Sequence, residues 1–132
     1  MAIRGTSYVH PITISYVWAA VDFGGAADIV QYFKGPAGKK GRVVDVSVET
    51  TEEFNSPTNP AHIYVGIETN TDSIFDWNLG DVAVDTVLNA TASFTPWENA
   101  IPADTLMLVS FIAMTGESPT GTANVRLFID WF

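Results

Sequence analysis

Four of the six basic residues of the chain lie within nine positions, so this segment is the strongest candidate for a charged contact. They flank the turn-forming sequence Gly-Pro-Ala-Gly at positions 35–38 and are Lys34, Lys39, Lys40 and Arg42. Such a loop can dock on an acidic surface, although a solvated hairpin loop has the same composition. It is not a Walker loop, because that motif needs a Ser or Thr after its lysine and Lys39 is followed by Lys40.

A run of acidic residues in the second half of the chain is a candidate cation site. It contains Asp72, Asp76, Asp81 and Asp85. Hard cations bind carboxylate oxygens, but an EF-hand loop also needs a glycine at its sixth position and a glutamate at its twelfth, and neither is present. Aspartate is equally common in turns. We therefore expect turns here and no metal site.

The chain contains few candidate catalytic residues. Glu49, Glu52 and Glu53 could supply the carboxylates of a glycosidase, but closeness in sequence says nothing about their separation across a cleft. The two histidines, His10 and His62, come without the Gly-x-Ser-x-Gly elbow that would favour a Ser-His-Asp triad. The absence of cysteine excludes thiolate nucleophiles, thiolate zinc sites and disulfides. We expect neither catalysis nor a cofactor.

Tryptophans form a second class of candidate contacts. Trp18 and Trp131 fall in strand-like runs, so we expect them in the core. Trp77 and Trp97 lie near loops, where they are better placed to meet a partner. An exposed tryptophan beside aspartate and asparagine could also stack on a sugar.

The composition indicates one compact domain, spanning residues 1–132, with an acidic surface. Of its residues 47% are hydrophobic and 16% are charged, and the net charge is −9. A chain of this length is one domain of ordinary size. The deficit of Lys and Arg disfavours nucleic acid and anionic membranes as partners, because basic residues make the contacts to phosphate. No segment reaches the ~20 apolar residues of a membrane-spanning helix.

Eight strand-like runs, separated by turns rich in Gly, Pro, Asn and Asp, would position these residues. The runs are Ile12–Phe23, Asp28–Lys34, Arg42–Thr51, Ala61–Thr69, Ser73–Trp77, Val82–Leu88, Thr105–Met114 and Thr122–Trp131. No long amphipathic helix is indicated. Many short strands with regular turns predict an all-β fold, a single antiparallel β-sandwich of the jelly-roll type.

The last run shows the alternation of a strand most clearly. One face is wholly apolar, so we expect it to face the core; it carries Ala123, Val125, Leu127, Ile129 and Trp131. The other face carries Phe128 and Phe132 among polar residues, and we expect these two rings to contact a second copy or another protein. The alternation in Arg42–Thr51 likewise predicts that Val44, Val46 and Val48 are buried.

Three segments carry a family resemblance when they are taken together. They are Lys34–Val46, Ile101–Phe111 and Ile129–Phe132. In this combination the chain resembles the small head proteins of tailed bacteriophages, and among these the capsid decoration, or cement, proteins, several of which are small jelly rolls. The resemblance implies a virion protein that is assembled in the host cytoplasm. Such a protein binds the major capsid protein on the capsid exterior and forms closed oligomers, of which we favour a trimer over a dimer.

The expected site residues combine the charge cluster with the aromatic candidates. Lys39, Lys40 and Arg42 would form a docking loop. The expected contacts to the capsid or to other copies are Trp77, Trp97, Phe128 and Phe132. The alternative is a receptor- or carbohydrate-binding module of a tail fibre or spike, in which Trp77 or Trp97 would be exposed beside Asp and Asn.

Overall fold

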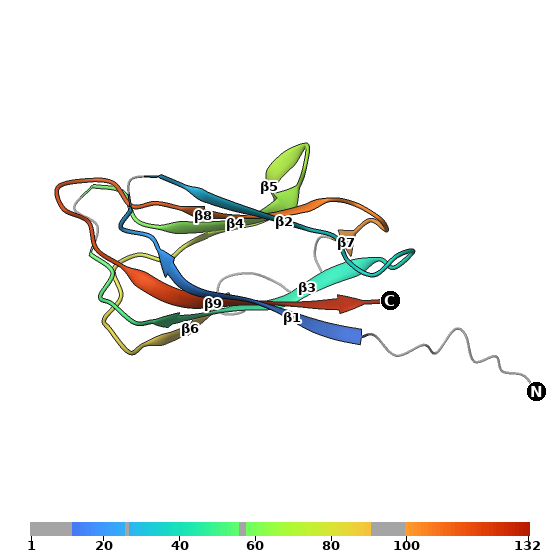
Figure 1. Cartoon of the computed structure of the whole chain (residues 1–132), viewed down its shortest axis with the longest axis horizontal. Helices are drawn as coiled ribbons and strands as arrows, with labels where there is room; N and C mark the ends of the chain where they lie inside the picture. Colours follow the sequence, from blue (N-terminus) through green and yellow to red (C-terminus); the bar gives the residue numbers. More distant parts are fainter. Residues whose placement is uncertain (1–11, 26, 56–57, 91–99) are drawn as a thin grey trace, which may run out of the picture.

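The computed structural model describes residues 12–25, 27–55, 58–90 and 100–132, which form nine strands (Figure 1). None of these residues belongs to a helix with the length and hydropathy of a transmembrane segment. The strands are β1 (Ile12–Asp22), β2 (Ile29–Phe33), β3 (Gly41–Thr50), β4 (His62–Ile67), β5 (Asn70–Asn78), β6 (Val87–Asn89), β7 (Ala100–Ile101), β8 (Met107–Ile112) and β9 (Thr122–Trp131).

The strands form two antiparallel sheets that pack face to face (Figure 1). Sheet A has the order β1-β9-β3-β6, with β7 also paired to β3, and sheet B has the order β2-β8-β4-β5. Along the chain, pairing runs from the middle outwards: β4 with β5, β3 with β6 and β7, β2 with β8, and β1 with β9. This is one long hairpin rolled into two sheets, which is the jelly-roll arrangement. The predicted fold class is confirmed.

The sixth predicted run, Val82–Leu88, is wrong over most of its length. Strand β6 starts only at Val87, and Asp85 adopts a left-handed conformation with φ of 57°. The cause is the buried Thr50, whose Oγ1 donates a hydrogen bond to the carbonyl of Ala83 at 2.7 Å and accepts one from the amide of Thr86 at 2.9 Å. These bonds curl the segment around Thr50 and prevent it from extending.

Two irregularities change which side chains face the core. The β3–β9 register shifts between Val43 and Asp45, so Val43 is buried and Val44 is only half-buried, against the predicted alternation. The β1–β9 register shifts between Trp18 and Val21, so inward positions change from even to odd numbers along β1. Such bulges insert one or more extra residues into a strand and increase its local twist.

The core lies between the sheets and is densest along β9. All five side chains of the apolar face of β9 are buried, as predicted. Trp131 is the largest of them, and its Nε1 donates a hydrogen bond to Tyr16 Oη at 3.1 Å. Burial raises the pKa of Tyr16, and this hydrogen bond partly opposes the rise. Trp18, predicted in the core, is partly buried and packs at its edge, 5.5 Å from the ring of Phe111.

Candidate functional site

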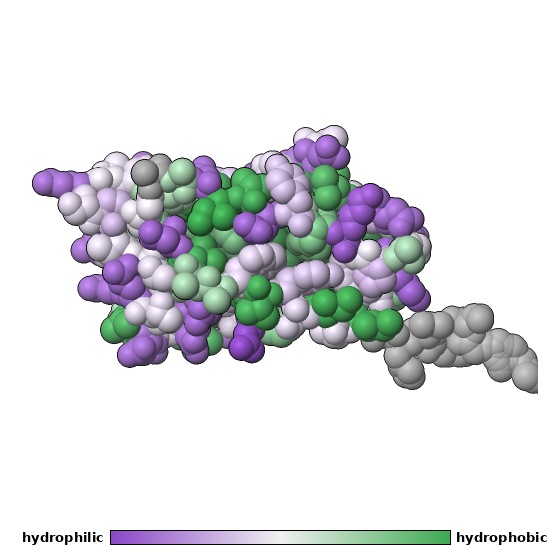
Figure 2. Space-filling model, in the orientation of Figure 1, coloured by the Kyte–Doolittle hydropathy of each residue, from purple (hydrophilic) through white to green (hydrophobic). Residues whose placement is uncertain are grey.

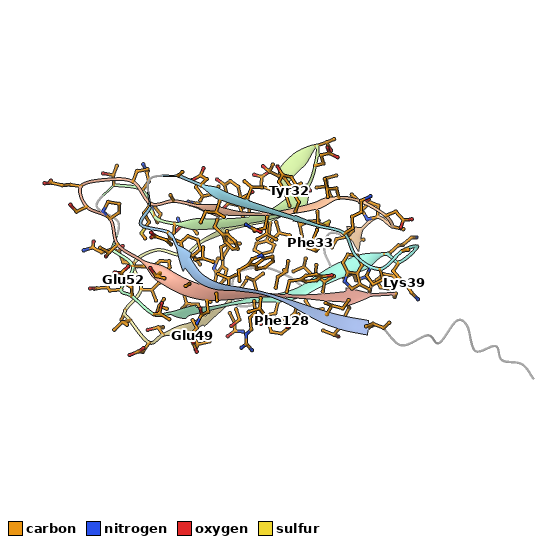
Figure 3. All side chains as sticks on the ribbon, viewed as in Figure 1. Tyr32, Phe33, Lys39, Glu49, Glu52 and Phe128 are labelled. Atoms are coloured by element: carbon orange, nitrogen blue, oxygen red, sulfur yellow. The ribbon has the colours of Figure 1, made fainter. Side chains whose placement is uncertain are left out.

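The predicted docking loop connects β2 to β3 and lies at one end of the sandwich, where Figure 3 labels Lys39. Its backbone is held at several points. The amide of Lys39 donates to the carbonyl of Pro36 at 3.1 Å, and the amide of Gly38 donates to Asp104 Oδ1 at 2.9 Å. Lys40 and Phe132 exchange two backbone hydrogen bonds, of 3.0 and 2.9 Å. The loop therefore has a fixed path on the protein surface.

Two glycines let this loop lie directly on the core. A Cβ atom on Gly41 would lie 2.6 Å from Cζ3 of Trp131. One on Gly35 would lie 2.5 Å from Cζ2 of the same ring and closer still to Cη2 and Cζ3. Because both glycines pack against the buried indole, the position of the lysines is coupled to the core.

Arg42 and Phe132, which we expected to be contact residues, contact each other. The guanidinium carbon of Arg42 lies 4.6 Å from the centroid of the Phe132 ring, within the range of a cation–π interaction. Both side chains are half-buried. Four of the expected residues therefore meet at one end of the sandwich. We call it the basic end and define it by Lys34, Lys39, Lys40, Arg42 and Phe132.

The opposite end of the sandwich is acidic. It consists of the β1–β2, β3–β4, β5–β6 and β8–β9 connections, and Figure 3 labels Glu52 there. The carboxylates in or beside these connections are Asp22, Asp28, Glu52, Glu53, Asp81, Asp85 and Glu117, and the same segments contain no Lys or Arg. We call this the acidic end. The acidic end thus carries carboxylates without Lys or Arg, whereas the basic end gathers four cations together with Asp104 and Asp130.

Phe128 lies apart from the basic end, on the outer face of sheet A (Figure 3). It borders a hollow of about 530 Å³. Strands β1, β9, β3 and β6 contribute its lining, which consists of Val17, Ala19, Asp45, Ser47, Glu49, Val87, Asn89, Asn124, Arg126 and Phe128. Glu49 was expected only as a possible catalytic carboxylate, and Arg126 had no expected role.

Trp77 is not a surface residue, which corrects the expectation that it contacts a partner. Strand β5 continues to Asn78, so Trp77 pairs with Ile63 inside sheet B and is only 7% exposed. Its position near a turn suggested exposure, but Trp77 lies on the same face of β5 as the buried Phe75. Trp97 lies outside the described residues. Trp77 is therefore no longer a candidate for stacking on a sugar.

Sequence reasoning missed an apolar side of the sandwich, formed by the edge strands β1 and β2. Tyr32 is 61% exposed and Ile12 52%, and Val30 is also exposed. Tyr16 and Phe33 meet across the two edges with ring centroids 4.4 Å apart. Figure 2 shows hydrophobic residues gathered on this side of the molecule. The outward positions of the run Asp28–Lys34 could have revealed Val30 and Tyr32.

The remaining titratable candidates among the described residues lie on sheet B and in the turns, and His10 lies outside the described residues. His62 Nδ1 lies 2.6 Å from Asp76 Oδ1, in an exposed pair on adjacent strands. Burial raises the pKa of the neighbouring Tyr64, and the negative charges of Asp76, Asp72 and Asp28 raise it further. Asp81 lies in the β5–β6 connection, at the acidic end. Among the described residues, no three His, Asp or Glu side chains converge where a metal ion could bind.

Comparison with known proteins shows a likeness in fold. No protein-family profile matches the chain, and no curated protein is detectably similar to it in sequence. Among solved structures, a chain of the "Cyanophage Pam1 capsid asymmetric unit" is similar, with a TM-score of 0.51 and 14% sequence identity. The match covers 98% of this chain and 91% of that chain. At this identity the likeness shows a shared fold.

Proposed function

We propose that this chain is a structural protein of a bacteriophage virion, which binds the outer surface of the capsid and stabilises the shell as a decoration, or cement, protein. Its resemblance to phage head proteins and its likeness in fold to a chain of a cyanophage capsid unit support this proposal. The protein acts through shape and charge and is not an enzyme. It assembles in the host cytoplasm together with the shell.

The observation that carries the proposal is the difference in charge between the two ends, with four cations gathered at one and none at the other. The basic end presents Lys39 and Lys40 from a loop whose backbone is held by hydrogen bonds, so it offers a preformed contact for an acidic surface of the major capsid protein. Complementary charge steers association and fixes orientation. The acidic end, with Glu52 and Glu117, would then face away from the shell. Each copy would bind neighbouring capsid subunits in the assembled shell but not free subunits. Binding would therefore shift the assembly equilibrium towards the intact shell.

The apolar side formed by β1 and β2 would be the contact between copies. Exposed strand edges with apolar side chains are sites where proteins associate. Tyr32 and Ile12 are the most exposed hydrophobic side chains of this side. Closed rings hide such surfaces without leaving a free edge, and a trimer would place three copies around a symmetry axis of the shell.

The test is a binding assay with capsid shells that were assembled without this protein. Purified wild-type protein should co-sediment with the shells, and added salt should weaken binding because exposed charges are screened. The double variant Lys39→Glu/Lys40→Glu should bind at least tenfold more weakly, since two attractive contacts become repulsive. The matched control, Glu53→Lys/Glu117→Lys, changes as many charges at the acidic end and should still bind. Equal binding by the two double variants would contradict the proposed docking end.

A further inference from the structure

We propose that the hollow on the outer face of sheet A binds a neutral saccharide. The site lies on the broad face of the sandwich and not at the basic end, so a copy docked through its lysine loop would leave it accessible. In Figure 3 the labelled Glu49 and Phe128 both lie on this outer face. The inference goes beyond the proposed capsid role and does not depend on it.

Strand register places the residues of the hollow in rows that cross the sheet. Val17 of β1 pairs with Arg126 of β9, Arg126 pairs with Ser47 of β3, and Ser47 pairs with Asn89 of β6. The short side chain of Ser47 lies between longer neighbours, which leaves the depression open. Its volume of about 530 Å³ is that of a small-molecule site.

Hydrogen bonds hold the polar side chains of the hollow in place before any ligand arrives. Asn124 Nδ2 donates to Glu49 Oε1 at 3.3 Å, while Asn124 Oδ1 accepts from the amide of Ala20 at 2.9 Å. Asn89 Nδ2 donates to Asp45 Oδ2 at 2.6 Å. Side chains that are already ordered lose less conformational entropy when a ligand binds. The hollow thus presents fixed carboxylate and amide groups, which is the chemistry that recognises hydroxyl groups.

Arg126 supplies donors at the centre of the site. It is exposed, and it forms no ion pair with the residues that the structure describes. Its guanidinium carries five N–H donors, while the carboxylate of Glu49 can accept more hydrogen bonds than the one it receives from Asn124. A hydroxyl both donates and accepts, so a sugar with adjacent hydroxyls can bind these two groups together.

Apolar side chains flank the polar groups. Phe128 is half-buried at the edge of the hollow, and Val17 and Val87 are exposed beside it. A pyranose ring has an apolar C–H face and a rim of hydroxyls, which matches an aromatic ring next to amide and carboxylate groups. The lining carries two carboxylates and one guanidinium, a net charge of −1, which disfavours phosphate and other polyanions. A neutral saccharide fits both features.

Titration with neutral oligosaccharides of glucose, galactose, mannose and N-acetylglucosamine, followed by two-dimensional NMR, tests the proposal. We expect at least one of these probes, at up to about 10 mM, to shift the amide signals of Arg126 and its neighbours on β3 and β9. Glu49→Gln and Arg126→Ala should each weaken that binding about tenfold or more, because each loses hydrogen bonds to a charged group. Glu68→Gln, in the turn between β4 and β5, is the matched control and should bind as the wild type does.

Three results would overturn the saccharide site: no binding by any probe, shifts confined to other faces, or unchanged affinity in both variants. The thermal midpoint of each variant should equal that of the wild type, since Glu49 and Arg126 are exposed; a variant that unfolds is replaced by Phe128→Ala. Capsid binding by Glu49→Gln and Arg126→Ala should be unchanged. A failure of the saccharide site is thereby distinguished from a failure of the capsid role.

Discussion

The contact between Gly35 and Trp131 allows a prediction that connects the docking loop to the core. In Gly35→Ala the new Cβ would lie 2.5 Å from Cζ2 of Trp131, whereas non-bonded carbon atoms are most stable about 3.5–4.0 Å apart. The indole cannot move away easily, because it is buried and its Nε1 is bonded to Tyr16. Overpacking of this kind costs about 1–3 kcal/mol. We expect the thermal midpoint to fall by roughly 3–12 °C.

Circular dichroism during heating, with urea unfolding in parallel, would measure this effect. Gly25→Ala is the matched control, because the nearest atom to its Cβ would be Asp22 Oδ2 at 3.4 Å, an ordinary contact. Trp131→Phe removes the outer ring of the indole, so Gly35→Ala should cost less in that background. A double-mutant cycle measures this coupling, for which we expect about 1 kcal/mol or more. A midpoint for Gly35→Ala equal to that of Gly25→Ala, with no coupling to Trp131→Phe, would refute the reasoning.

Two further predictions concern stability at high pH and self-association. Burial raises the pKa of Tyr16 above its ordinary value of 10.0, so the neutral phenol stabilises the fold fully below about pH 10 and this contribution is lost as the pH rises through the folded pKa. Urea unfolding at pH 8 and pH 11 should therefore show a smaller loss of stability in Tyr16→Phe than in the wild type, and equal losses would contradict this assignment. If the β1–β2 side joins copies, Tyr32→Glu should dissociate the oligomer in sedimentation experiments while Val84→Glu, an exposed valine elsewhere, should not. A wild-type protein that sediments as a monomer would rule this contact out.

The fold was predictable because its main signals are local. The alternation in β9 identified both the bounds of the strand and its buried face, since every second residue is apolar and all of these are buried. The failures came from contacts that are distant in sequence. Val82–Leu88 alternates like a strand, but the hydroxyl of Thr50 curls it. The bulge at Val44 has no marker residue, so the valine expected inside is displaced by Val43.

The candidate sites show the same difference between local signals and contacts that are distant in sequence. The basic end was predictable because four cations are neighbours in the sequence and one loop carries them. The hollow was not, because Val17, Glu49, Val87 and Arg126 come from four strands and meet only through the register of sheet A. Trp77 failed as a surface residue for a related reason. It shares the inward face of β5 with Phe75, two positions earlier, and both rings are buried.

The rolled hairpin has a consequence for how the nascent chain folds. Strands β4 and β5 are joined by a short turn and can pair as soon as both leave the ribosome. Sheet A cannot close in this way, because β9 follows the other eight described strands along the chain and must insert between β1 and β3. Until then, the edges of β1 and β3 that face β9 lack this partner, which leaves them open to aggregation. Sheet A therefore reaches its full strand order only after the ribosome has translated β9, up to Trp131.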